Sequence, residues 1–434
     1  MPEAYLTGDW HLASVTAAGL LRLGYTVHLR PDAANVPDPE AFDALTRGER
    51  CAEEPGVAEI LGAARAAGTL RPVLDRTDAV QVLARADLCL VAHDTGTSPD
   101  GTAADPRPAA ALAELLAHPG RLGPVVAEGQ LKAGSCDAAL AAAGLPADSP
   151  DLVHLPENLR LGRAVEDFLH PARAVVGCNA LDLPPAVRAL LDALAPAAER
   201  PMRLVEAELV KHGTNAYLAC CITLANDLGA IAGRLGADPV TVLDGVRADE
   251  RVADRAPLRP GDAYAGATLH RDVRALIEHG EPYGRDGLFR AVANANAVHA
   301  LAPLAVLDRR LDGLAGRTVC LLGLTYKPGV STLRDAPGLR LARELLAQGA
   351  AVTAHDPVAE PTNTGDVRRF HTAAEAVAGA DCVALVVEHP AFADPALLAS
   401  TAPRRPLLLR LTGAEGRSRV PTPPGWTSVD QWND

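Results

Sequence analysis

The sequence is poor in aromatic side chains, in lysine and in closely spaced cysteines. Only 3% of its 434 residues are aromatic, and of its 41 basic side chains only Lys132, Lys211 and Lys327 are lysines. The eight cysteines include no CxxC pair, so the sequence indicates neither a zinc site nor a disulfide framework, and we predict no bound metal. Basic charge is also in deficit. The formal net charge of -13 argues against a nucleic acid or an anionic membrane surface as partner.

Two further absences concern where the protein resides. We find no apolar run approaching the roughly 20 residues of a membrane-spanning helix, and the amino end, MPEAYLTGDW, lacks the basic-then-apolar order of a signal peptide. We therefore expect a soluble, cytoplasmic protein with no membrane partner. With 48% hydrophobic and 22% charged residues the composition is that of a globular protein, and its length predicts two or three domains.

Short apolar segments alternate with helical patterns in the first and last parts of the chain, which is typical of parallel sheets covered by helices on both faces. The predicted strands include residues 25–29, 88–92, 125–127, 174–176, 318–323, 351–356 and 382–387. Between the two parts, residues 207–235 contain no proline and only three glycines, consistent with one long buried helix. We predict an α/β fold of two Rossmann-like doubly wound domains, residues 1–200 and 306–434, joined by a central helical domain, residues 201–305.

Three polar residues share one face of the predicted long helix. Glu208, Lys211 and Asn215 lie at i, i+3 and i+7, so a carboxylate, an ammonium group and an amide project together. Lysine is informative here because an ammonium, unlike a guanidinium, can be tuned by burial to exchange a proton near neutral pH. Two alternatives stay open: the few lysines survive by chance, or Lys211 only forms a salt bridge with Glu208.

Several segments resemble the motifs of the UDP-glucose/GDP-mannose dehydrogenase family. The helix matches E-x-x-K-x-x-x-N, and residues 260–272, PGDAYAGATLHRD, resemble the loop P-G-x-G-[FY]-G-G-x-C-x-x-K-D. Residues 156–168, PENLRLGRAVEDF, resemble a sugar-proximal P-E-x-L-x-x-G-x-A loop, and residues 54–56 resemble E-P-G. Residues 323–335, GLTYKPGVSTLRD, are similar to G-[LF]-[AST]-[FY]-K-x-x-x-x-D-x-R-E-S. The resemblance runs in order along essentially the whole chain.

The resemblance implies an NAD-dependent enzyme that oxidises the C6 hydroxymethyl group of a nucleotide hexose, with a UDP-hexose expected before a GDP-hexose. It implies that Lys211 stabilises an oxyanion or exchanges protons, that Asn215 orients the sugar and that Asp272 holds a water. Glu157 would be the general base of hydrolysis or would anchor its water. The residues implied in substrate binding are Asn158, Leu159, Arg160, Arg251, Tyr264, Gly266, Lys327 and Arg334.

The resemblance also implies a homodimer formed through the central domain, with the nucleotide bound by the carboxy-terminal domain. Some of the implied residues have simpler interpretations. Glu157 and Asp272 are also explained as surface charges, and Arg251 by itself is as well explained by a surface role as by a binding role.

The chain departs from the family at the nucleophile. Family enzymes oxidise their substrate twice, through a thioester on a cysteine of the loop, and Thr268 stands at that position here. A threonine hydroxyl without an adjacent base is a poor nucleophile, so we expect the oxidation to stop at the aldehyde.

The predicted cofactor loop departs as well. Residues 8–13, GDWHLA, align with the pattern G-x-G-x-x-G. Gly8 is the first glycine of the pattern, and Trp10 replaces the second. An alanine, preceded by Leu12, replaces the third. The acidic residue expected after the second strand comes one position late, as Asp32. The family's G-T-P and S-T-V-P-x-G-T segments become residues 94–97, which include Thr95, and 129–135. We interpret these residues as a degenerate NAD site and predict weak NAD binding.

Three hypotheses follow. The first is a divergent NAD-dependent nucleotide-sugar 6-dehydrogenase. The second is an enzyme that keeps the sugar site, has lost NAD and does non-redox acid/base chemistry with Lys211, Asp272 and Glu157. The third is a catalytically silent binding subunit.

Overall fold

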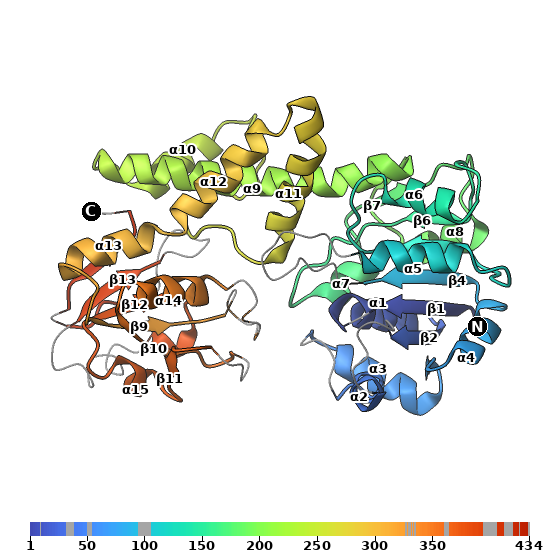
Figure 1. The fold of residues 1–434 in the computed structure, drawn as a ribbon, viewed down its shortest axis with the longest axis horizontal. Coiled ribbons are helices and arrows are strands. Elements are labelled where there is room, and N and C mark those ends of the chain that lie inside the picture. Colours follow the sequence, from blue (N-terminus) through green and yellow to red (C-terminus); the bar gives the residue numbers. More distant parts are fainter. Residues whose placement is uncertain are drawn as a thin grey trace. The chain divides into compact units, whose positions relative to one another are not determined.

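The structure is a computed structural model that describes most of the chain. The described residues are 1–8, 10–31, 39–49, 54–93, 106–325, 328, 331, 333, 336–359, 364–393, 406–411, 420–424 and 426–432, without the side chains of residues 10, 39, 41, 267 and 430. The chain divides into two compact units, Met1–Gly213 and Thr214–Asp434, and each is described by itself (Figure 1).

The first unit is built on an eight-stranded sheet with the strand order β3-β2-β1-β4-β5-β6-β7-β8. Its neighbours pair in parallel, except β6 with β7, which are antiparallel. The strands are β1 (Glu3–Gly8), β2 (Thr26–Pro31), β3 (Leu70–Pro72), β4 (Leu88–Ala92), β5 (Val125–Ala127), β6 (Leu152–His154), β7 (Ala174–Gly177) and β8 (Glu199–Met202). The order reverses direction between β1 and β4, which is the topological switch point of a doubly wound sheet.

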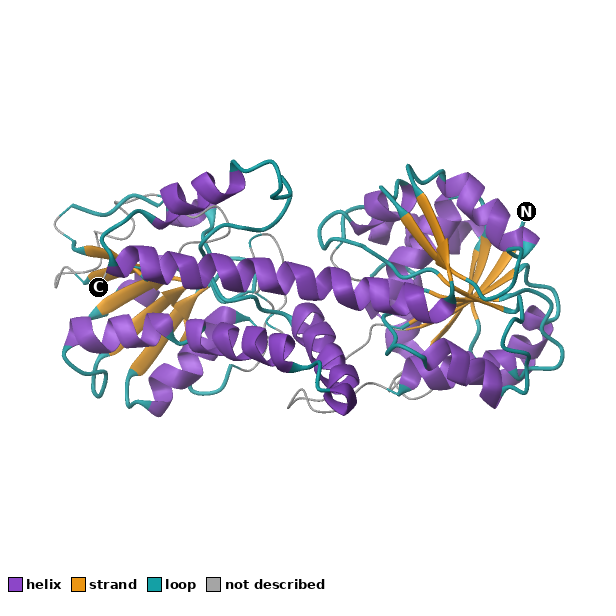
Figure 2. Cartoon of the chain, turned by 90° about the horizontal axis from the view of Figure 1, so that it is seen from above, coloured by secondary structure: helices purple, strands orange, loops and turns teal. Residues whose placement is uncertain are grey.

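Helices cover both faces of this sheet (Figure 2). They are α1 (Trp10–Arg22), α2 (Pro39–Thr46), α3 (Val57–Ala67), α4 (Arg76–Leu83), α5 (Arg107–Leu116), α6 (Ser135–Ala142), α7 (Ala164–Leu169) and α8 (Pro185–Leu194). Successive side chains of a strand point to opposite faces. Accordingly Leu6 packs in one apolar cluster with Leu20 of α1, while its neighbour Tyr5 packs in a second cluster with Leu112 of α5.

The long helix α9 (Leu204–Arg234) begins in the first unit and continues into the second. The other helical elements of the second unit are α10 (Pro239–Arg247), α11 (Ala267–Gly280), η1 (Glu281–Tyr283), α12 (Gly287–His299), α13 (Ala302–Leu311), α14 (Pro337–Ala347), α15 (Ala373–Val377) and η2 (Pro390–Phe392). By length and composition α9 is apolar enough to cross a membrane, so the expectation that no segment approaches a span is wrong by that criterion. A core helix passes the same test, and α9 buries Glu208, Lys211 and Asn215 within the chain.

The second unit also contains a sheet, with the order β11-β10-β9-β12-β13-β14 and parallel pairing throughout. Its strands are β9 (Thr318–Leu322), β10 (Ala351–His355), β11 (Arg368–Arg369), β12 (Cys382–Leu385), β13 (Leu407–Arg410) and β14 (Ser428–Asp430). Along β9, Leu321 packs in one apolar cluster and Leu322 in another. Two doubly wound sheets and a long central helix confirm the predicted fold class, whereas the predicted domain boundaries stay a prediction.

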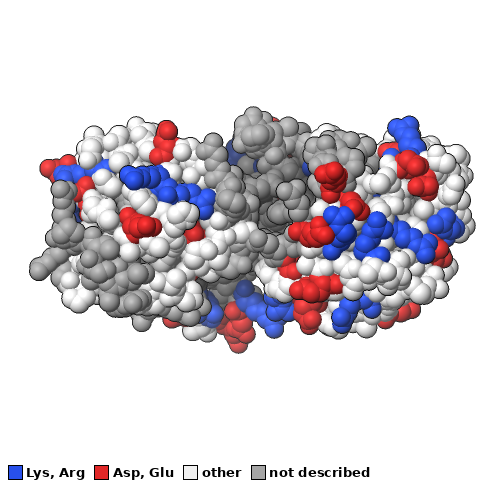
Figure 3. Space-filling model, turned by 90° about the horizontal axis from the view of Figure 1, so that it is seen from below, with Lys and Arg blue, Asp and Glu red and all other residues white. Residues whose placement is uncertain are grey.

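Charged side chains on the face drawn in Figure 3 occur as basic groups next to acidic ones. Ion pairs within the first unit have the same character: Arg47 and Arg65 both pair with Asp43, and Arg85 pairs with Glu3 at 2.8 Å. Such exposed pairs contribute little stability. They show that these arginines have acidic partners within the chain.

Candidate functional site

The first part of the candidate site is the turn from β1 to α1, at the switch point of the first sheet. Gly8 ends β1 and α1 begins at Trp10. A Cβ at Gly8 would collide with the carbonyl oxygen of Ala92, the last residue of β4, and would lie 2.9 Å from the Cβ of Ala13. The strand, the turn and the helix therefore pack as closely as a dinucleotide-binding unit requires, with alanine small enough at the third glycine position.

The positions that the motif predicts to face a dinucleotide depart from the G-x-G-x-x-G pattern in sequence. By alignment with that pattern Trp10 stands at the second glycine, and its side chain is not among the described residues. Pro31, where an acidic residue is expected, ends β2, and the predicted residues Asp32 and Thr95 lie outside the described residues. Leu12 is 4% exposed and packs in the core, which leaves only its backbone for cofactor binding.

A buried carboxylate connects α1 to the loop that precedes α7. Glu54 Oε1 lies 3.0 Å from His11 Nε2, and the carboxylate accepts hydrogen bonds from the amides of Gly162 at 2.8 Å and Ala164 at 3.1 Å. Burial raises the pKa of Glu54, but these hydrogen bonds outweigh it and the pKa is lowered. The E-P-G segment thus holds the loop that carries Glu157 at its other end, a connection that the separate motifs did not reveal.

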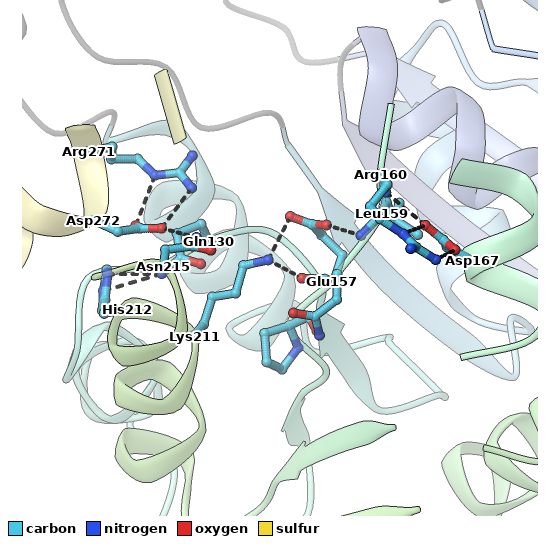
Figure 4. Close-up of polar contacts among 12 residues, drawn as sticks. Gln130, Glu157, Leu159, Arg160, Asp167, Lys211, His212, Asn215, Arg271 and Asp272 are labelled. Atoms are coloured by element: carbon cyan, nitrogen blue, oxygen red, sulfur yellow. Dashed lines mark hydrogen bonds and ion pairs between the residues drawn. The ribbon is translucent and has the colours of Figure 1, made fainter. Parts of the chain in front are cut away.

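Lys211 of α9 reaches into the loop that follows β6. Its ammonium group donates to the main-chain carbonyl oxygen of Glu157 and lies 3.3 Å from Glu157 Oε1 (Figure 4). The side chain of Lys211 is 7% exposed and that of Glu157 is 24% exposed. The structure therefore brings together two of the predicted catalytic residues, with the carboxylate open to solvent and the ammonium group nearly enclosed.

The remaining predicted residues of this loop hold its shape. The amide of Leu159 donates to Glu157 Oε2 at 2.8 Å, and Asn158 Nδ2 donates to the carbonyl oxygen of Pro156 at 3.3 Å. Arg160 forms a bidentate ion pair with Asp167, and the side chain of Arg160 is 65% exposed. The first contact fixes the carboxylate beside Lys211, whereas the charge of Arg160 is directed to Asp167.

Glu208 does not pair with Lys211, so the simple helix salt bridge is wrong. Its carboxylate accepts from the amides of Gly134 at 2.6 Å and Cys136 at 2.9 Å, at the start of α6. Burial raises the pKa of Glu208, and the two backbone hydrogen bonds oppose that shift. Glu208 anchors α9 to α6 and leaves the ammonium group of Lys211 to Glu157.

Several buried polar groups lie near this pair in the first unit. Glu128, directly after β5, accepts a hydrogen bond from Thr16 at 2.6 Å, and burial followed by the charge of Glu157 raises its pKa to about 7. Burial lowers the pKa of His154 to about 4. Gln130 Nε2 lies 3.0 Å from Nδ1 of His212, whose Nε2 is 2.8 Å from the carbonyl oxygen of Leu131. With Gln130 as the donor, Nδ1 of His212 accepts and its Nε2 donates to Leu131.

Asn215 lies one helical turn beyond Lys211 and makes its contact in the second unit. Its Nδ2 donates to Oδ2 of Asp272, which is fully buried in α11, and Arg271 Nε lies 3.2 Å from Asp272 Oδ1 (Figure 4). Thr268 is exposed on the same helix, one turn before Asp272. Asp272 is thus no surface charge, and sequence reasoning missed Arg271 although it is the adjacent residue.

The loop before α11 is fastened to α12. The amide of Tyr264 donates to Asn296 Oδ1 at 2.8 Å, and Asn296 Nδ2 donates back to the carbonyl oxygen of Tyr264 at 3.0 Å. Gly266 precedes α11 with φ of 75°, a backbone conformation that favours glycine. Arg251 does not contribute to this arrangement, because its side chain is 85% exposed and pairs with Asp249 at 2.6 Å.

The carboxyl edge of the second sheet contains a further buried carboxylate. Asp356, after β10, accepts from the amides of Leu324 at 2.7 Å and Thr325 at 3.0 Å, in the motif that follows β9. Burial raises its pKa, but His389 and the backbone hydrogen bonds lower it well below the usual range. Asp356 therefore fixes the start of the segment containing Lys327 and Arg334, which themselves lie outside the described residues.

Comparison with known proteins finds matches to one family in three consecutive segments of the chain. Family models for the UDP-glucose/GDP-mannose dehydrogenases match residues 34–193 as the NAD-binding domain, 205–298 as the central domain and 320–409 as the UDP-binding domain. The UDP-glucose 6-dehydrogenase AglM of Haloferax volcanii is 30% identical over 413 residues, which cover 90% of this chain and 92% of that protein. The UDP-glucose 6-dehydrogenase of Pseudomonas aeruginosa is 35% identical, but the match spans 56% of that protein.

Solved structures show the same architecture. A UDP-glucose dehydrogenase from Pyrobaculum islandicum superposes with a TM-score of 0.81 at 29% identity and covers 96% of this chain and 95% of its own. A UDP-D-ManNAc dehydrogenase from Pyrococcus horikoshii gives the same TM-score at 19% identity, covering 99% of both chains, and this similarity concerns the fold alone.

Proposed function

Because the chain belongs to the UDP-glucose/GDP-mannose dehydrogenase family, we propose that it is a nucleotide-sugar 6-dehydrogenase whose preferred substrate is a UDP-hexose. The observation that carries the proposal is the set of contacts made by α9. Lys211 is directed to Glu157, and Asn215, one turn further, is directed to Asp272. Each contact joins residues of two motifs that are far apart in the sequence.

The described residues have distinct roles in this proposal. The enclosed ammonium group of Lys211 stabilises the oxygen of the reacting hydroxymethyl group as it gains negative charge, because a buried charge acts most strongly away from water. Glu157 Oε1, 3.3 Å from that ammonium group and open to solvent, accepts the released proton. Asn215, held by the buried Asp272, orients the sugar.

NAD, when bound, supplies the hydride acceptor. Gly8 and the start of α1 would hold it at the switch point of the first sheet, where the packing against Ala92 and Ala13 suits a dinucleotide. Trp10 and Pro31 replace the residues that would favour the pyrophosphate and the ribose, so we propose weak NAD binding.

We propose that the product is the aldehyde. Thr268 stands at the position of the family's cysteine, and a threonine hydroxyl without a neighbouring base does not form the thioester that the second oxidation requires. The second candidate function is nucleotide-sugar binding without oxidation, which the tryptophan at position 10 favours.

The test measures NADH and products from UDP-glucose. We expect NADH to form, with the aldehyde as its carbon product by mass spectrometry. Lys211→Met should lower kcat about a hundredfold or more, as the loss of a group that stabilises a developing oxyanion does. Arg200→Met, at an exposed basic residue outside the predicted motifs, is the control and should leave kcat unchanged. No NADH from any UDP- or GDP-hexose, together with a nucleotide-sugar-dependent rise in melting temperature, would favour the second candidate.

We also propose that the protein is a cytoplasmic homodimer. Tyr217, Leu224 and Ile231 repeat every seven residues along α9 and are 51%, 50% and 56% exposed. This spacing places them on one face of the helix, and a second copy related by a two-fold axis would bury the same face. Leu224→Glu should halve the mass measured by light scattering, and an unchanged mass would contradict this interface.

A further inference from the structure

The backbone of Gly261, at the start of the loop 260–266, is held by three buried side chains. Its N–H donates to Asn226 Oδ1 at 2.9 Å. Its carbonyl oxygen accepts from His299 Nε2 at 2.8 Å and from Gln431 Nε2 at 2.9 Å. The three side chains are 1%, 8% and 7% exposed, so water does not compete for these hydrogen bonds. Both lone pairs of the carbonyl oxygen are thereby used.

The three side chains come from segments that are far apart in the sequence. Asn226 belongs to α9, His299 is the last residue of α12, and Gln431 directly follows β14 at the edge of the second sheet. The loop is thus hydrogen-bonded to α9, to α12 and to the edge of the second sheet, whose strands β10 to β12 lie within the match to the family's UDP-binding domain.

Trp432 fixes the position of Gln431. Its ring stacks on that of His299 with centroids 5.2 Å apart and planes inclined by 18°. Two glycines of α9 make room for it: a Cβ at Gly229 would lie 3.2 Å from the indole, and one at Gly233 would collide with the carbonyl oxygen of Trp432. Neither Gln431 nor His299 can therefore shift far without disturbing the packing on α9.

His299 acts as a donor in its neutral form. Burial lowers its pKa, and the carbonyl oxygen of Gly261 and the charge of Asp227 oppose that shift only in part. A neutral imidazole carries one N–H, and the contact with Gly261 requires it at Nε2. The same helix provides Asn296, which holds Tyr264 three residues further along the loop.

We propose that Gln431 and His299 are positioning residues for the loop 260–266, and that the carboxy-terminal sheet sets the place of Thr268 and α11 through the carbonyl oxygen of Gly261. We call the hydrogen bonds of Gln431 and His299 to Gly261 the latch. The existence of the latch does not depend on the proposed function, whereas the importance of the loop for the reaction rests on that function.

The experiment measures amide hydrogen exchange of the full chain in four variants. Gln431→Met keeps the size of the side chain but removes the donor, and Gln348→Met, at an exposed glutamine, is the matched control. His299→Leu removes the other donor, whereas His299→Gln retains an N–H of similar reach and should rescue the contact.

We expect peptides spanning residues 259–266 to exchange about fivefold faster in Gln431→Met and in His299→Leu, the factor given by the loss of one buried hydrogen bond. Exchange should stay at the wild-type rate in His299→Gln and Gln348→Met, and peptides from β9 and β10 should not change in any variant. Unchanged exchange at residues 259–266 would overturn the proposal. Equal acceleration throughout the unit would also overturn it, since the two side chains would then serve general stability.

A kinetic measurement separates this inference from the proposed function. If the chain forms NADH from UDP-glucose, Gln431→Met should lower kcat about fivefold and leave the KM for NAD unchanged. A raised KM for NAD with unchanged kcat would count against a positioning role. If wild-type protein forms no NADH, the proposed function fails, and the exchange data still decide whether the latch exists.

Discussion

The most direct test of the site concerns Asp272, the buried carboxylate that joins α9 to α11. It is 0% exposed and accepts from Asn215 Nδ2 and from Arg271. We expect Asp272→Ala to destabilise the unit that contains it far more than a surface aspartate does. Asn215 is 7% exposed, so its amide has little access to replacement water when the carboxylate is removed.

The magnitude follows from the two contacts. A hydrogen bond to a charged group contributes about 1.5 to 3 kcal/mol, and a buried donor left without a partner costs about 1 to 3 kcal/mol. The guanidinium of Arg271 recovers part of its loss, because its side chain is 17% exposed and reaches water. Together these contributions predict a decrease of about 2.5 to 6 kcal/mol in the free energy of unfolding.

The assay is urea unfolding followed by circular dichroism, with Asp249→Ala as the matched control. Asp249 also pairs with an arginine, but Arg251 is 85% exposed, so that pair should contribute little stability. Asp272→Asn keeps the shape and one acceptor and should lose about 1 to 2 kcal/mol. If Asp272→Ala lost no more stability than Asp249→Ala, the buried contact with Asn215 would not hold, and its role in orienting the sugar would fall with it.

Three other predictions concern pH, the cofactor and the nucleophile. Burial raises the pKa of Glu128 from 4.5 to about 7, so the stability that its protonated form contributes at low pH is lost as the pH rises through about 7. Glu128→Gln should remove this loss. The difference in unfolding free energy between the variant and wild type should therefore change by about 3 kcal/mol between about pH 5 and about pH 8. A pH-independent difference would show that Glu128 ionises normally. Trp10→Gly should tighten NAD binding about tenfold or more in calorimetry, and unchanged affinity would shift attention to the missing ribose acid. Thr268→Cys should yield some uronate by mass spectrometry, whereas uronate as the main product of the unaltered chain would contradict the aldehyde.

The fold class was predictable because it depends on local patterns. Strands buried on both faces appear as short apolar runs, and the predicted segments 88–92 and 125–127 coincide with β4 and β5. The long helix was predicted within a few residues from its lack of proline. Element ends agreed within a residue or two: the strand predicted over residues 25–29, ending at Pro31, is β2 (Thr26–Pro31).

The candidate site was predictable only in part. Periodicity along α9 placed Glu208, Lys211 and Asn215 on one face, but it also suggested a salt bridge between the first two. In the structure Glu208 instead binds the start of α6, because two backbone amides there need an acceptor. The residue pattern of α9 contains no information about those amides. The contact of Glu54 with the amides of Gly162 and Ala164 was hidden for the same reason.

What the sequence determined by itself is the order of elements, the motifs and their departures at Trp10 and Thr268, since each depends on residues close together in the chain. The tertiary structure decided which polar groups meet: Lys211 with Glu157, Asn215 with Asp272, and Gly261 with His299 and Gln431. The physical reason is that a buried polar group must find a partner wherever the fold brings one within reach, and that choice depends on packing between segments rather than on the sequence around either residue.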